Sequence, residues 1–296
     1  MKGALTAKFS EGDILFLVET VDPALLSKID TIKDDPDIIE GMMEHEASKL
    51  FQRIMLMSEE TITTTISPRF LFEILLRTAH RELEGQAYTV ERTATQRIPV
   101  FDTPEVVRFL NNKVVLKYLA DMLTSFTRIE SFTLPVRVRK GVWRKVRFND
   151  MDIDSLVRFC QAVDEEHRFG FYKRIADLCL FILGMFPEYV PMDYRYPSSG
   201  EMRPRLFGRL RRSAEDYEEE GRRFYKLAGE HRDATLLDIA EVLQQLHDKF
   251  NLAKKPLNFI SEHFLQFRKE KLYHGCLLYT SPSPRDLSTS RMPSSA

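Results

Sequence analysis

The sequence lacks the motifs by which the common enzyme and metal-binding families are recognised. Only three of its 296 residues are cysteine, and one is tryptophan. The cysteines form no CxxC pair, and no GxGxxG, GxxxxGK[ST] or GxSxG pattern occurs. These absences exclude the usual zinc, dinucleotide, P-loop and serine-hydrolase signatures. We therefore expect no metal, no cofactor and no enzymatic activity, with a site assembled from scattered polar residues as an alternative.

Long apolar runs and a strong net charge are also missing. The longest apolar run, 178–186, is far shorter than a membrane span, and the first twenty residues have no secretory pattern. Cys160 and Cys179 lie in apolar helical segments, which is typical of a reducing compartment. The formal net charge of -1 creates no global field that would favour nucleic acid or anionic lipid. A soluble, cytoplasmic protein that binds no membrane is expected.

Helix starts are what the sequence shows most clearly. A capping residue followed by proline occurs at Asp22-Pro23, Asp35-Pro36, Ser67-Pro68 and Thr103-Pro104. Each pair opens a segment whose apolar residues recur at steps of three and four, the spacing of one helical face. The pattern predicts helices near 36–57, 68–84, 104–126, 152–163, 167–186, 214–230, 234–251 and 256–273. "SAEDYEEE", beginning at Ser213, predicts a capping box.

One region alternates with a period of two instead. The stretch "FTLPVRVRKGVWRKVRFND" predicts a β-hairpin over about 132–148 that turns at Lys140-Gly141. A weaker extended stretch runs from Tyr88 to Val100. The predicted fold is therefore mainly α, a multi-helix, bundle-like architecture with one small antiparallel β-hairpin. The order of elements over 68–148 resembles a winged-helix unit, which implies a hairpin wing and a preceding helix that enters the major groove.

The hairpin is the leading candidate for function. No acidic residue occurs between Ser131 and Asn149, where six basic residues do. Strand alternation predicts one basic face, which consists of Arg137, Arg139, Trp143, Lys145 and Arg147. Such a face can bind phosphates by counterion release, and tryptophan can stack on a base. The alternative is a solvated ribbon whose charges protect its edges.

A second candidate lies in a long proline-containing segment, 187–212. Aromatic and basic residues are interleaved there, as in a nucleic-acid surface or a protein hot spot: Tyr194, Arg195, Tyr196, Arg205 and Arg209. Alternatively, its arginines can form ion pairs with the acidic helical turn that follows. Because loops of this length are uncommon within one domain, 187–212 is predicted to be either a linker or a functional loop. We place a domain boundary there, between a helical domain that carries the hairpin, 1–186, and a helical-hairpin region, 213–275.

The other polar clusters give weaker evidence for a functional site than the hairpin does. His45 lies in a helix pattern that resembles a zinc-protease helix, but Lys49 occupies the position of the second histidine. Asp177 interrupts the most apolar predicted helix, and a buried carboxylate there needs a partner. Arg174 and Lys173 are the nearest candidates, and such a pair fixes packing more often than it catalyses.

The last stretch, 276–296, departs from the rest in composition. Read as codons, Cys276 to Asp286 resembles the transposase adapter used in short-read sequencing libraries. After a gap that matches a short index, Ser290 to Ala296 matches the fixed primer that follows in that design. We therefore expect 276–296 to be a non-native tail and the native chain to be truncated near His274.

These observations favour a non-enzymatic intracellular protein that binds a macromolecule, with DNA or RNA at the hairpin as its first candidate partner. A helical protein-interaction module, which would use the helices after Ser213, is the competing hypothesis.

Overall fold

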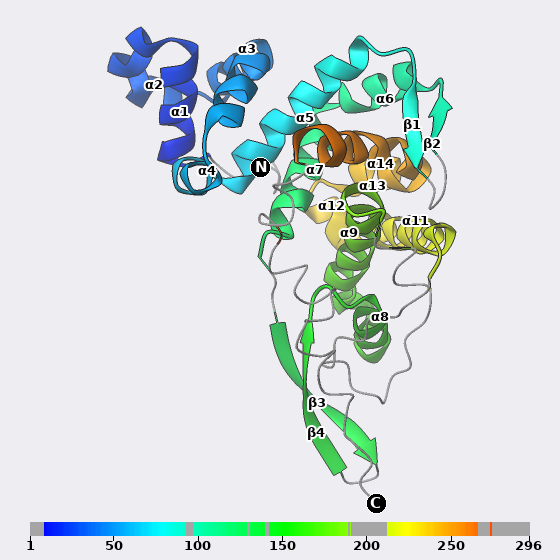
Figure 1. Ribbon diagram of the computed structural model, residues 1–296. Helices are drawn as coiled ribbons and strands as arrows, with labels where there is room; N and C mark the ends of the chain where they lie inside the picture. Colours follow the sequence, from blue (N-terminus) through cyan, green and yellow to red (C-terminus); the bar gives the residue numbers. More distant parts are fainter. Residues whose placement is uncertain are drawn as a thin grey trace, which may run out of the picture.

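The chain is mainly helical, with two small antiparallel sheets (Figure 1). The computed structural model describes residues 9–92, 97–128, 131–139, 142–188, 190, 212–265 and 273. Its helices are α1 (Glu11–Val21), α2 (Ile29–Lys33), α3 (Pro36–Leu56), α4 (Glu59–Thr65), α5 (Pro68–Glu84), α6 (Thr103–Leu110), α7 (Lys113–Ser125), α8 (Ile153–Ala162), α9 (Phe169–Met185), α11 (Ala214–Glu230), α12 (Arg232–Leu236), α13 (Ala240–Asp248) and α14 (Phe250–Phe259). The predominantly helical fold predicted from the sequence is confirmed.

The strands form two separate hairpins. Strand β1 (Thr89–Arg92) pairs with β2 (Arg97–Val100), and β3 (Ser131–Arg139) pairs with β4 (Val142–Asn149). The second hairpin confirms the one predicted over 132–148, because Arg139 pairs with Val142 on either side of the predicted turn. The first corresponds to the weaker extended stretch at 88–100.

Three of the four predicted capping residues open a helix as expected. The side chains of Asp35 and Ser67 accept hydrogen bonds from backbone amides in the first turns of α3 and α5. Asp22 does the same for the short 3-10 turn Pro23–Lys28. Ser213 forms the predicted capping box with Asp216, since each side chain accepts from the other residue's backbone amide.

The fourth start, at Thr103-Pro104, differs by one residue. Asp102 occupies the cap position of α6, and its carboxylate does not cap the helix. It accepts a hydrogen bond of 2.5 Å from Thr89 Oγ1 on β1 and pairs with the buried Lys255 on α14. The prediction of Thr103 as the capping residue was wrong, because Thr103 is the first residue of α6 and Asp102 precedes it at the cap position.

Two predicted helices are each divided. The segment 104–126 breaks into α6 and α7 at Asn112, whose Oδ1 accepts from Val114 N at 3.0 Å and starts a new helix. The segment 234–251 breaks between α12 and α13, where Asp238 adopts φ 57. Few residues other than glycine tolerate this left-handed conformation, and aspartate is among them. Both breaks use short polar residues that the apolar periodicity passes over.

The last predicted helix, 256–273, begins too late. Pro256 lies inside α14 rather than at its start, and a π-helical turn, Ile260–Phe264, continues the helix. The apolar residues Phe250, Ala253 and Leu257 are buried on both sides of the proline. Burial of this continuous face outweighs the lost backbone hydrogen bond, which costs about 3 kcal/mol in an exposed helix interior.

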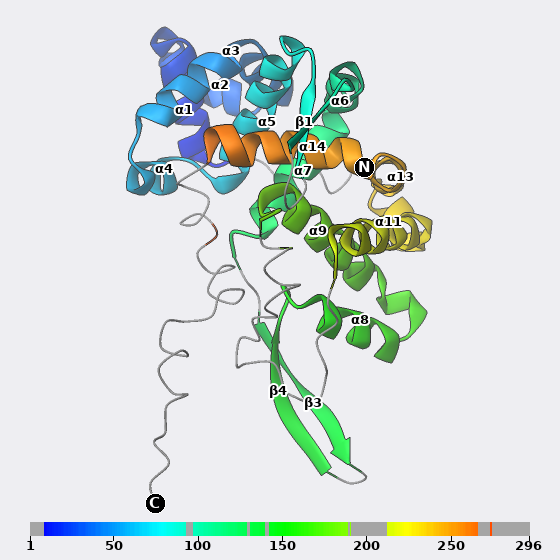
Figure 2. The same cartoon turned by 45° about the vertical axis from the view of Figure 1, so that its right-hand side comes forward.

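Helix α9 lies at the centre of the core, where α11 and α14 both pack against it, and Figure 2 shows α11 beside it. Both contacts depend on glycine. A Cβ atom at Gly221 of α11 would lie 3.0 Å from Cys179 Cβ of α9 and 2.6 Å from the Phe250 ring of α14, and one at Gly184 of α9 would lie 2.7 Å from the Leu257 side chain of α14. Because the missing side chains let the helices approach closely, α9 is buried almost all around.

The domain boundary predicted at 187–212 falls between α9 and α11, which pack against each other. One hydrophobic cluster extends from Ile14 to Tyr273 and includes residues from both sides of that boundary. Residues 191–211 are outside the described part of the chain, so the division into domains stays a prediction. The C-terminal stretch 276–296 also falls outside it.

Asp177 is buried in α9 at the point where three helices meet. Lys173, one turn earlier, donates to Asp177 Oδ2 at 2.7 Å, and this confirms one of its two predicted partners. The hydroxyls of Tyr118 on α7 and Tyr225 on α11 donate to Oδ1 at 2.7 and 2.9 Å. Burial, followed by the negative charge of Asp177, raises the pKa of both tyrosines, so they remain protonated donors. The second predicted partner, Arg174, contacts other residues.

A charge cluster joins α3, α5 and α7. The buried guanidinium of Arg77 contacts three carboxylates: Glu73 at 2.8 Å, Glu40 at 2.6 Å, and Glu44. Lys117 of α7 contacts Glu40 from the other side at 2.8 Å. Because a planar guanidinium can hold several carboxylates at once, this cluster fixes the packing of the three helices.

Glu40 makes the stability of this cluster depend on pH. Burial alone would raise its pKa, but Lys117 and Arg77 together hold the pKa at about 2, below the ordinary value of 4.5. The folded state therefore gains stability above pH 4.5 and loses it as the pH falls from 4.5 towards 2.

We expect Glu40→Gln to be less stable than the wild type by on the order of 2 kcal/mol at pH 7. The gap should close as the pH falls to about 2, where Glu40 in the wild type also becomes neutral. Urea unfolding at several pH values between 2 and 7 measures both curves. Glu230→Gln, at an exposed pair with Lys226, is the control and should follow the wild type. A gap that stays constant with pH would contradict the assignment.

Candidate nucleic-acid interface

The β3–β4 hairpin extends away from the helices as a two-stranded ribbon in both views (Figures 1 and 2). Its register pairs Thr133 with Arg147, Pro135 with Lys145, and Arg137 with Trp143. Alternate positions of a β-ribbon share a face, so four of the five predicted site residues occupy equivalent register positions. The sequence prediction of their spacing agrees with this backbone pairing.

Arg139 does not follow that alternation. The register shifts between Arg137 and Arg139, so that Arg139 pairs with Val142 while Arg137 pairs with Trp143. Two residues of β3 therefore oppose one residue of β4, as in a β-bulge. Period-two reasoning from the sequence placed Arg139 with the other basic residues because a bulge is invisible to a strict alternation.

Arg174 of α9 contacts the chain on both sides of the hairpin in sequence, at Ser125 six positions before β3 and at Asp150 directly after β4. One guanidinium nitrogen donates to Ser125 Oγ at 2.8 Å, at the end of α7, and another pairs with Asp150, directly after β4. The guanidinium also lies 3.8 Å from the centre of the Phe126 ring, which stacks on Phe181 of α9 at 4.2 Å. These three contacts form a clamp at the base of the hairpin, and we call it the Arg174 clamp.

The sequence offered no signal for the clamp. Arg174 and Asp150 are separated by 24 positions, and the periodicity of α9 favoured Asp177 as the partner of Arg174. Helix geometry alone does not show whether Lys173 or Arg174 pairs with Asp177, because both lie about one turn from it. The packing of α7 against α9 decides between them.

Acidic residues gather beyond the end of β4. Asp150, Asp152 and Asp154 follow the strand at every second position. Asp150 pairs with Arg174, Asp154 pairs with Arg212 at 2.7 Å, and Ser155 donates to Asp152 at 2.5 Å. The charge along the hairpin therefore changes from basic in the strands to acidic and internally paired at the base.

The second predicted contact set, in the segment 187–212, lies outside the described residues. This applies to Tyr194, Arg195, Tyr196, Arg205 and Arg209. The neighbouring Arg212 is described and buried, and it bridges Asp154 and Glu220 at 2.7 and 2.6 Å. Arg212 therefore forms ion pairs with acidic residues of α8 and α11. Pairing with acidic neighbours is the alternative role that the sequence offered for the arginines of this segment.

The helix before the hairpin, α7, is largely committed to the core. Its residues Val115, Leu119 and Leu123 are buried. Its two lysines form ion pairs with α3: Lys113 with Glu40 and Glu44, and Lys117 with Glu40. The resemblance to a winged-helix unit therefore stays one of element order, because α7 directs its lysines to acidic neighbours.

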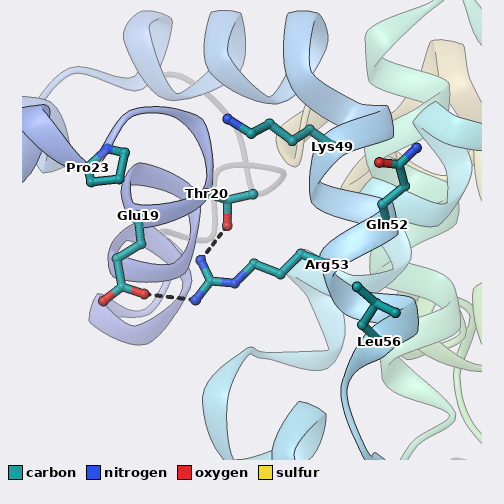
Figure 3. Close-up of a pocket in the computed structure, with 7 residues that line it drawn as sticks. All are labelled: Glu19, Thr20, Pro23, Lys49, Gln52, Arg53 and Leu56. Atoms are coloured by element: carbon teal, nitrogen blue, oxygen red, sulfur yellow. Dashed lines mark hydrogen bonds and ion pairs between the residues drawn. The ribbon is translucent and has the colours of Figure 1, made fainter.

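A shallow groove of about 590 Å³ lies between α1 and α3 (Figure 3). Two cations from α3 reach across it: Arg53 binds Glu19 and Thr20 at 2.9 and 2.7 Å, and Lys49 Nζ donates to Val21 O at 3.0 Å. Since these donors hold the carboxyl end of α1, the groove is the seam between two packed helices.

In the part of the chain that the structure describes, no three His, Cys, Asp or Glu side chains lie close enough to hold a metal ion. No helix within the same residues is both long and apolar enough to span a membrane. Comparison with protein-family models, with curated proteins and with solved structures finds no match.

Proposed function

We propose that this protein binds nucleic acid through the β3–β4 hairpin. The observation that carries the proposal is a two-stranded ribbon, rich in basic residues and free of acidic ones, that extends from the helical body. Nucleic-acid affinity arises mainly from phosphate neutralisation by lysine and arginine, with release of counterions. The net charge of the whole chain is -1, so attraction has to come from a local patch of this kind.

The arrangement of the ribbon supports the same proposal. Among the described elements, neither strand packs extensively against a helix. The competing hypothesis of an interaction module after Ser213 requires an apolar groove there. In the described part of 213–265, the large exposed apolar residues are Leu236 and Leu237, which lie together in one turn. A cytoplasmic location stays a prediction.

Charge reversal on the ribbon tests the proposal. The full chain is required, because α11 and α14 cover α9 and a fragment that ends at residue 186 would expose its core. We expect the wild type to bind DNA or RNA with an affinity that falls linearly in a plot of log K against log salt. Arg137→Glu, Lys145→Glu and Arg147→Glu together should weaken binding at least about tenfold and reduce the salt slope by about 3.

The matched control carries the same charge change elsewhere. Lys33→Glu, Lys226→Glu and Arg232→Glu alter three exposed cations far from the hairpin in sequence, each in a surface ion pair. This variant should retain most of the affinity, since only the general field changes. Absence of salt-dependent binding by the wild type, or equal losses in both triple variants, would refute the proposal. Filter binding at several salt concentrations gives all of these values.

A further inference from the structure

The dimensions of the β3–β4 ribbon suit one class of nucleic acid in particular. The strands contain nine and eight residues, which corresponds to a length of about 30 Å at ~3.3 Å per residue, with the strands ~4.8 Å apart. The major groove of B-form DNA, about 12 Å wide, admits a two-stranded ribbon. The major groove of an A-form RNA duplex is too narrow for protein elements to read.

The charge along the hairpin also favours insertion over a flat contact. Basic residues occur throughout 137–147, whereas Asp150, Asp152 and Asp154 follow at the base. Phosphates are attracted to the first region, whereas at the base Asp150 and Asp154 already pair with Arg174 and Arg212. The register shift at Arg139 adds local twist and bend, and a twisted ribbon follows a helical groove better than a flat one.

An element that inserts into a groove needs a fixed direction. Since neither strand packs extensively on a helix of the described chain, the direction of the ribbon depends on its base. The Arg174 clamp holds Ser125 before β3 and Asp150 after β4 with one guanidinium, which also covers the Phe126 ring. Lysine has neither the planar fork nor the stacking face that makes these contacts simultaneously.

From these observations we infer that the hairpin binds duplex DNA in the major groove and that Arg174 is the residue that positions it. The inference rests on the proposed function and narrows it to one partner. Arg174 itself needs no contact with DNA. It acts by holding the ribbon at one angle to the helical body, so that less orientational freedom is lost on binding.

Competition among nucleic acids of equal length tests the partner. The full chain is titrated with a DNA duplex, an RNA duplex and single-stranded DNA of the same sequence. We expect the DNA duplex to bind at least about tenfold more tightly than the others. Dimethyl sulfate then reports the groove: bound protein should protect guanine N7, which faces the major groove, and leave adenine N3 in the minor groove reactive.

Arg174→Lys tests the positioning role. This variant keeps the charge but loses the fork, and we expect it to bind duplex DNA about tenfold more weakly. The salt slope should stay that of the wild type, since the phosphate-binding residues are unchanged. Asp150→Asn, which removes the charge of the partner with little change in shape, should act in the same direction. Arg222→Lys, at a comparable fork on α11 that contacts Glu218 and His247 O, is the control.

The outcomes separate the two proposals. If the wild type binds no nucleic acid, both the proposed function and this inference fail. If it binds RNA or single strands as tightly as duplex DNA, or protects adenine N3 instead of guanine N7, nucleic-acid binding stands and the groove assignment falls. Wild-type affinity in both folded clamp variants, Arg174→Lys and Asp150→Asn, would overturn the positioning role. Thermal unfolding, measured beside each titration, establishes that a variant is folded at the assay temperature.

Discussion

Asp177→Ala is expected to lower the free energy of unfolding by about 3–5 kcal/mol, the range found when one partner of a buried charge network is removed. The carboxylate is almost fully buried and accepts three hydrogen bonds from Tyr118, Lys173 and Tyr225. Truncation leaves two buried phenol hydroxyls without an acceptor and a cavity between three helices. Each unsatisfied buried group costs about 1–3 kcal/mol.

Conservative variants should divide this loss into its parts. Tyr118→Phe and Tyr225→Phe each remove one donor and leave the acceptor in use, so each should cost about 1 kcal/mol. Asp30→Ala is the matched control, because Asp30 forms an exposed i,i+3 pair with Lys33. It should change stability by less than about 1 kcal/mol. Chemical denaturation measures all four variants, and a loss below 1 kcal/mol for Asp177→Ala would show that the network contributes little.

Tyr273→Ala is expected to destabilise the protein by a similar amount, about 3–5 kcal/mol, as for other large aromatic truncations in a core. Tyr273 is fully buried. Its ring lies 5.0 Å from Phe181, 5.8 Å from Phe186 and 5.9 Å from Phe72, with which it stacks. These neighbours belong to or adjoin α5 and α9, so the loss would open the centre of the core.

Two control variants distinguish the stability contributed by the Tyr273 ring from that of its hydroxyl, and that of a buried aromatic side chain from that of an exposed one. Tyr273→Phe keeps the ring and should cost about 1 kcal/mol. Phe101→Ala removes an aromatic side chain that is 78% exposed and should change stability by no more than about 0.5 kcal/mol. If Tyr273→Ala behaves like Phe101→Ala in thermal unfolding, Tyr273 does not belong to the core.

Much of the helical fold follows from local sequence. Helices α3 and α5 begin at Pro36 and Pro68, as their capping residues predict, and α11 begins after the capping box at Ser213. These signals work because a cap satisfies backbone amides within one turn, so the information lies within four residues. Local sequence does not reveal distant contacts, such as that of Asp102 before α6, whose carboxylate binds Lys255 instead of capping the helix.

Some features of the hairpin follow from local sequence, and others do not. Its two strands were predictable, because alternation is a local property, while the predicted turn at 140–141 lies outside the described residues. The register shift at Arg139 was not, since a bulge changes the pairing without changing the composition. The sequence left Lys173 and Arg174 open as partners of Asp177, and Lys173 is the one that binds it. The contacts of Arg174 were not predictable, because helical spacing shows only which residues are near along one helix.

The sequence by itself determined the helical class of this protein, the starts of α3, α5 and α11, the hairpin and its basic character, since each depends on residues a few positions apart. Only the tertiary structure decided where the charged side chains pair. Asp177 accepts hydrogen bonds from Tyr118 of α7 and Tyr225 of α11, and Arg174 pairs with Asp150 at the base of the hairpin. These contacts join segments separated by 24 to 59 positions, and their geometry exists only once the helices pack on one core.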